Sequence, residues 1–150
     1  MGLQGGSHGG YEAMRALTFP PVVNDRKEQF DWGFAISDYG ISNIIDYHET
    51  CNIPDWVTQK AGDPETEREK LMERSPVSHA VYAAGPLFLA HGENDKRVPV
   101  EQSRQMAKAM EEAEKPYTYV EFSEQGHGWD GLEENLRYYK ALFKFLNNVT

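Results

Sequence analysis

The sequence is poor in cysteine, in basic residues and in long apolar runs. Cys51 is the only cysteine in 150 residues, so no internal disulfide can form, which favours a reducing compartment. The 24 acidic residues outnumber the 15 basic ones and give a net charge of −9, which argues against a nucleic-acid-binding surface. No apolar stretch is long enough to span a membrane, and residues 1–15 lack the apolar core of a secretory signal. These absences predict a cytoplasmic protein that binds neither nucleic acid nor membranes.

The rest of the composition is that of one globular domain. Apolar residues make up 39% of the chain and aromatic residues 12%, and 150 residues are enough to bury a core. Short apolar or β-forming runs predict strands at 2–4, 32–37, 86–90 and 117–122. Helical patterns separate these runs, at 9–17, irregularly through 41–74, and at 100–113. This alternation predicts an α/β fold with a mostly parallel sheet covered by helices on both faces.

Two further features complete the predicted elements. Pro20 and Pro21 end the first helix, and a charged loop is expected at 22–31. A closing helix near the C-terminus has apolar residues at helical spacing, and we expect this stripe to face the core. Its members are Leu132, Leu136, Tyr139, Phe143 and Leu146.

The first motif with chemical meaning is Gly5-Gly-Ser-His-Gly9, a G-x-S-x-G pattern. Such a turn between a strand and a helix presents its serine, here Ser7, as a nucleophile. Gly5 and Gly9 are expected to avoid side-chain clashes in the turn, and Gly10 to let the helix approach closely. The backbone N–H of His8, at the start of the helix, is the predicted oxyanion donor. Taken alone the pattern is moderately specific, because glycine-rich loops that contain serine are common.

An acid and a base follow two later strands. Asp95 lies in His-Gly-Glu-Asn-Asp after the run at 86–90, and His127 lies in Gln-Gly-His-Gly after the run at 117–122. Because the carboxyl ends of parallel strands meet at one edge of the sheet, we expect both to approach Ser7. The chain order serine, acid, histidine is that of α/β-hydrolases. His127 would be the general base and Asp95 would orient its ring. Each residue alone would pass for an ordinary loop residue; the combination is specific.

Longer segments around these residues resemble the catalytic domain of the prolyl oligopeptidase family, most of all its acylaminoacyl-peptidase and dipeptidyl-peptidase branches. The segments that carry the resemblance are Gly5–Tyr11, Leu87–Ser103 and Gly126–Gly128. The similarity covers essentially the whole chain. It implies that residues 1–150 are the C-terminal part of an α/β-hydrolase catalytic domain, whose N-terminal strands are missing.

The resemblance implies a serine peptidase that hydrolyses short peptides through an acyl-enzyme, with Ser7, Asp95 and His127 as its triad. It implies no metal and no organic cofactor. In this family, residues at the positions of Tyr39, Tyr47 and Trp56 tend to form the hydrophobic wall of the substrate pocket. Packing in the core is the alternative role for these three aromatic side chains.

Family members carry a β-propeller and the first strands of the sheet ahead of the serine. A loop in that region supplies a second oxyanion donor, and one lost donor typically costs about 10²–10³ in rate. We therefore expect little or no peptidase turnover from this chain alone. We also expect self-association through the uncovered sheet edge near residues 2–4.

Two other functions use the same residues. A carboxylesterase or other acyl hydrolase would need the same triad, and the sequence does not identify the bond that is cut. A fragment without catalytic activity, which acts by pairing with another chain, would keep the triad residues only by descent.

Overall fold

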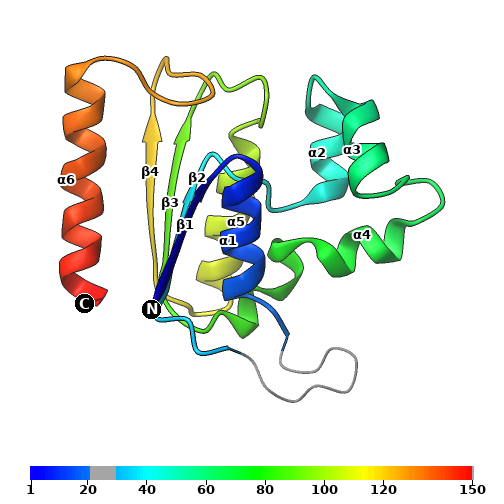
Figure 1. The fold of residues 1–150 in the computed structure, drawn as a ribbon, viewed down its shortest axis with the longest axis horizontal. Coiled ribbons are helices and arrows are strands. Elements are labelled where there is room, and N and C mark those ends of the chain that lie inside the picture. The colour runs from blue at the N-terminus through cyan, green and yellow to red at the C-terminus, as the bar shows by residue number, and fades with distance from the viewer. Residues whose placement is uncertain (21–29, 150) are drawn as a thin grey trace.

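A parallel sheet of four strands lies at the centre of the structure (Figure 1). The computed structural model describes residues 1–20 and 30–149. The strands follow the order β1-β2-β3-β4, and each neighbouring pair is parallel. They are β1 (Gly2–Gly6), β2 (Phe34–Asp38), β3 (Leu87–Gly92) and β4 (Tyr117–Phe122). The four predicted strands are therefore confirmed, with small shifts at their ends.

Helices connect the strands and cover the sheet. The segment 41–74 contains three short helices, and a 3₁₀ helix (Pro76–Tyr82) leads into β3. The α-helices are α1 (His8–Leu17), α2 (Ile44–Thr50), α3 (Pro54–Lys60), α4 (Arg68–Arg74), α5 (Glu101–Glu112) and α6 (Leu132–Val149). The charged loop expected at 22–31 lies outside the described residues, apart from its last two. Among the residues that the structure describes, no helix has the length and apolar character needed to cross a membrane.

Helices α1 and α5 pack on one face of the sheet (Figure 1). In α1, Met14 and Leu17 are fully buried, three residues apart on one side of the helix. In α5, Met106 and Met110 are fully buried and belong to the same apolar cluster, together with Leu89 of β3. Burial of such side chains supplies most of the stability of a layered α/β domain.

Helix α6 covers the opposite face, so the prediction of helices on both faces is confirmed (Figure 1). Its Leu142 and Phe145 pack with Phe88 of β3. Tyr138, on the same side of α6, donates a hydrogen bond from its hydroxyl to Oδ2 of Asp38 over 2.9 Å. Burial raises the pKa of Asp38, although the hydrogen bond from Tyr138 partly offsets this effect.

The prediction of which α6 residues face the core is wrong. Tyr138, Leu142 and Phe145 face the sheet, whereas most of the predicted stripe lies in solvent. The exposed fractions are 77% for Leu132, 48% for Leu136, 49% for Tyr139 and 60% for Phe143, and Leu146 alone packs partly against the core. The helix carries two apolar stripes, and helical spacing cannot distinguish between them. The ring of Phe88 in β3 and the carboxylate of Asp38 contact the stripe that contains Tyr138.

A small lobe of helices follows β2 and lies beside α1. Ile44 and Tyr47 of α2, Val57 of α3 and Leu71 of α4 form its apolar core with Val98, from the loop after β3. The lobe therefore contacts the segment that carries Asp95, next to the carboxyl edge of the sheet.

Candidate active site

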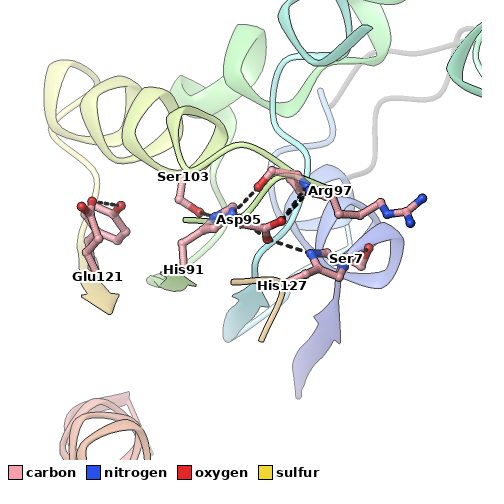
Figure 2. Close-up of polar contacts among 9 residues, drawn as sticks. Ser7, His91, Asp95, Arg97, Ser103, Glu121 and His127 are labelled. Carbon is pink, nitrogen blue, oxygen red and sulfur yellow. Dashed lines mark hydrogen bonds and ion pairs between the residues drawn. The ribbon is translucent and has the colours of Figure 1, made fainter. Parts of the chain in front are cut away.

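Ser7, Asp95 and His127 converge at the carboxyl edge of the sheet (Figure 2). They follow β1, β3 and β4 respectively, as the sequence predicts. Nε2 of His127 lies 3.1 Å from Oγ of Ser7. Nδ1 of the same ring lies 2.7 Å from Oδ2 of Asp95. The three groups thus form one continuous chain of hydrogen bonds.

Ser7 lies on a strained turn between β1 and α1. Its φ of 56° is in the left-handed region, which is uncommon for a residue with a Cβ. The turn is held by the Ser7 N–H, which donates to the carbonyl of Asp38 over 2.9 Å. Its carbonyl accepts from the N–H of Tyr11, within the first turn of α1. This backbone conformation directs the hydroxyl towards His127.

The glycines of this turn differ in what surrounds them. A Cβ on Gly5 would lie 2.3 Å from the carbonyl oxygen of Gly9, and one on Gly10 would lie 2.8 Å from Cα of Gly40. Both positions therefore require glycine, because the obstacle is backbone. A Cβ on Gly9 would meet nothing within 4 Å. The expectation that Gly9 avoids a clash within the protein is wrong, since its Cα faces away from the packed turn.

Asp95 is 5% exposed and accepts hydrogen bonds at both carboxylate oxygens. Oδ1 accepts the backbone N–H groups of Arg97 and Val98, over 2.8 and 2.9 Å. Oδ2 accepts from His127 and lies 3.4 Å from Nε2 of His91. Burial alone would raise the pKa of Asp95, but the nearby Nε2 of His91 and the hydrogen bonds from Val98 and His127 outweigh it and lower the pKa. The carboxylate is therefore ionised around neutral pH.

The ionised carboxylate sets the tautomer of His127. Because a carboxylate only accepts, the proton of the neutral ring lies on Nδ1, and the lone pair of Nε2 faces Oγ of Ser7. The ring of Tyr39 packs against the imidazole, with the ring centroids 4.7 Å apart. The ring of His127 is thus held by its hydrogen bond to Asp95 and by the packing of Tyr39 against one face. This is the arrangement that a general base needs.

Comparisons with known proteins identify the family of the chain. A sequence model described as the prolyl oligopeptidase family matches residues 1–150. The chain belongs to this family.

Curated members and solved structures of hydrolases are similar to the chain over most of its length. Dipeptidyl aminopeptidase BIII of Pseudoxanthomonas mexicana is 37% identical over 141 residues, which are 89% of this chain and 19% of that protein. A structure of a Mycobacterium tuberculosis puromycin-hydrolyzing peptidase matches with a TM-score of 0.87 and 28% identity, over 99% of this chain and 22% of that one. A probable carboxylic ester hydrolase, LipM of Mycobacterium tuberculosis, is 28% identical over 144 residues, 87% of this chain and 32% of that protein. The chain thus spans between about a fifth and a third of these relatives, and the solved structures share its α/β-hydrolase fold.

A cavity of about 100 Å³ lies next to the turn that carries Ser7. His8, the residue after Ser7, contributes to its wall, and the ring of Trp56 meets the His8 ring edge-on at 6.0 Å. The lining residues are His8, Tyr11, Ile41, Ile44, Tyr47, Trp56, Val57, Lys60, Ala61 and Arg74. The cavity is mostly apolar and has two cationic side chains in its lining.

The structure brings two of the three predicted pocket residues to this cavity. Tyr47 and Trp56 line it, and burial raises the pKa of Tyr47 to about 12, so its phenol stays neutral. Tyr39 lies elsewhere, packed between the rings of His127 and Trp129. The residue that sequence reasoning missed is His91. Its position just before Gly92, four residues ahead of Asp95, was the available signal.

Proposed function

We propose that the chain carries the catalytic centre of a serine peptidase that hydrolyses short peptides. The observation that supports this most directly is the hydrogen-bonded chain from Oγ of Ser7 through His127 to Oδ2 of Asp95, at 3.1 and 2.7 Å. A buried carboxylate, an oriented imidazole and a hydroxyl within reach make up the machinery of acyl transfer. The lone thiol of Cys51 is compatible with action in the reducing cytoplasm.

The proposed reaction gives each of the site residues a defined role. Oγ of Ser7 attacks the carbonyl carbon of the substrate while Nε2 of His127 removes its proton. Asp95 stabilises the imidazolium that results. The backbone N–H of His8 is one of the groups that a helix leaves unpaired at its N-terminus, and it donates to the oxyanion. His127 then protonates the leaving amine, and a water molecule activated by the same ring hydrolyses the acyl-enzyme.

The cavity beside His8 is the proposed site for a substrate side chain. Its walls include the aromatic rings of Tyr47 and Trp56 and the aliphatic side chains of Ile41 and Ile44. Such walls favour an apolar side chain on the acyl side of the cleaved bond. Tyr39, by contrast, acts on catalysis through its packing against the ring of His127.

Hydrolysis of carboxylic esters is the second candidate function. The same three residues would perform it, and the similarity to LipM favours it specifically. Esters have a better leaving group than amides and need less stabilisation of the transition state. The backbone N–H of His8 would supply an oxyanion donor in either reaction. We therefore expect an ester hydrolase to turn over an ester but not a peptide, and a peptidase to turn over both. Comparison of a nitrophenyl ester with a chromogenic peptide distinguishes the two functions.

Reaction with a fluorophosphonate tests the proposal without requiring turnover. We expect one probe to add to the intact chain, at Ser7, because the serine and base are already in place. The measurement is intact mass followed by peptide mapping, with Ser7→Ala as the control that should stay unmodified. A folded chain that remains unmodified, or equal modification of the Ser7→Ala variant, would contradict the proposal.

Self-association through the edge of β1 is a separate proposal. In the described sheet β1 is an outer strand whose one neighbour is β2, so the backbone groups on its other side can pair with a second copy. Light scattering should show a molar mass that rises with protein concentration. The variant Phe143→Glu, on the exposed stripe of α6, should associate equally well. A constant monomer mass, or association that disappears in Phe143→Glu, would refute pairing through this edge.

A further inference from the structure

His91 is a buried histidine that the proposed reaction does not use. It lies in β3 with 0% of its surface exposed, and both ring nitrogens are in close polar contacts (Figure 2). Nδ1 lies 2.7 Å from Oγ of Ser103, on α5. Nε2 lies 2.7 Å from the carbonyl oxygen of Val98 and 3.4 Å from Oδ2 of Asp95. A fully buried imidazole with two such contacts has one orientation.

The partners of His91 also determine its protonation pattern. The carbonyl of Val98 only accepts, so Nε2 must carry a hydrogen. The hydroxyl of Ser103 can donate to Nδ1, which leaves the ring neutral. The Nε2–H then lies between two acceptors, the Val98 carbonyl and Oδ2 of Asp95.

The charged and titratable groups around His91 come from four segments. Asp95 lies in the loop after β3 and His127 in the loop after β4. On β4, Glu121 is the register partner of His91, and its carboxylate is already bound by Arg104 of α5 and by the hydroxyl of Tyr119. The carboxylate of Asp95, and not that of Glu121, is therefore available to the Nε2–H of His91.

Both histidines contact the same oxygen of Asp95. Oδ2 accepts from Nδ1 of His127 and lies next to Nε2 of His91, whereas Oδ1 is occupied by backbone N–H groups. We propose that His91, held by Ser103, is a positioning residue that aims Oδ2 of Asp95 at His127. This inference rests on the proposed triad. The close approach of the His91 Nε2–H, with Nε2 3.4 Å from Oδ2, is the largest of the effects that lower the pKa of Asp95, which agrees with the geometry.

A positioning role and a merely structural role differ in what they predict. If His91 only fills space, its loss lowers stability and leaves the folded active site unchanged. If His91 positions the carboxylate of Asp95, replacement of His91 also slows acylation of Ser7 in the folded protein. A misplaced carboxylate stabilises the imidazolium less, so the rise of the labelling rate with pH should move to lower pH. The low-field proton resonance of the His127 Nδ1–H should shift as well.

The variants His91→Leu and His91→Gln provide the test. Leucine removes both nitrogens, whereas glutamine retains an N–H donor that can reach the carboxylate. At a temperature where circular dichroism shows each variant folded, we expect fluorophosphonate labelling of His91→Leu to slow by roughly 10²-fold or less, as for small misplacements of catalytic groups. His91→Gln should recover part of this loss.

The chain offers a matched pair of serines as a control. Ser42 and Ser103 are both fully buried, and both hydroxyls make a short hydrogen bond. The Ser42 hydroxyl donates to the carbonyl of Gln102 over 2.6 Å, and the Ser103 hydroxyl lies 2.7 Å from Nδ1 of His91. Ser103→Ala should slow labelling several-fold and shift the resonance, whereas Ser42→Ala should change neither.

Several outcomes would overturn the inference. One is labelling of folded His91→Leu and His91→Gln at the wild-type rate, with an unchanged pH profile and resonance. Another is equal slowing in Ser42→Ala and Ser103→Ala. If His91→Leu does not fold, the glutamine and serine variants decide. If the wild-type chain is not labelled at all, the proposed function fails, and the resonance of His127 in the variants still tests the role of His91.

Discussion

Replacing His127 with alanine is expected to slow acylation of Ser7 on the order of 10⁶-fold, the scale of losing the base in a triad. The imidazole is the only base within reach of the hydroxyl among the described contacts, at 3.1 Å, and Asp95 beyond it contacts the ring and not the serine. Without the ring, the serine hydroxyl keeps its proton at neutral pH and is a poor nucleophile. The measurement is the rate of fluorophosphonate labelling by intact mass.

His48→Ala is the matched control for this variant. Its ring contacts the hydroxyl of Thr58 over 3.0 Å, in the helical lobe, and takes no part in the hydrogen-bonded chain at Ser7. Labelling of the control should match that of the wild type. Labelling of His127→Ala within tenfold of the wild-type rate would mean that another group activates the serine, and the proposed role of His127 would be wrong.

The positions of the three reactive groups were predictable because the sheet is parallel. Ser7, Asp95 and His127 each follow a run that forms a buried or half-buried strand, and parallel strands end at one edge. The sequence also shows their order along the chain. It does not contain the distances, which depend on loops such as the one that brings the carbonyl of Gln125 to the N–H of Asn94.

The features that the sequence did not predict depend on which residues pack against a given side chain. Periodicity showed an apolar stripe on α6 but could not show that Tyr138, on another side, bonds to Asp38 and faces the sheet. Tyr39 was expected in the pocket wall, but its φ of 43° and the strand end before it direct its ring towards His127. His91 reads as one more residue of an apolar strand until the position of Ser103 is known.

Alanine at Gly5 is the second change with a large expected effect. A Cβ there would lie 2.3 Å from the carbonyl oxygen and 2.4 Å from the carbonyl carbon of Gly9, and backbone atoms in the first turn of α1 cannot move without moving Ser7. We expect Gly5→Ala to lose about 1–3 kcal/mol of stability through overpacking. We also expect labelling of Ser7 to slow on the order of 10²-fold, the scale for displacement of a reacting group by about 1 Å.

Gly9→Ala is the matched change within the same motif. Its Cβ would meet nothing within 4 Å, and alanine in a helix is favoured over glycine, so the free energy of unfolding should rise by roughly 0.5–1 kcal/mol. Chemical denaturation and labelling of the two variants, measured side by side, test whether the turn is fixed by contacts within the protein. If Gly5→Ala labels at the wild-type rate, the close approach of Gly5 to Gly9 does not position the nucleophile. If Gly9→Ala also destabilises the chain, the start of α1 is more crowded than the described contacts show.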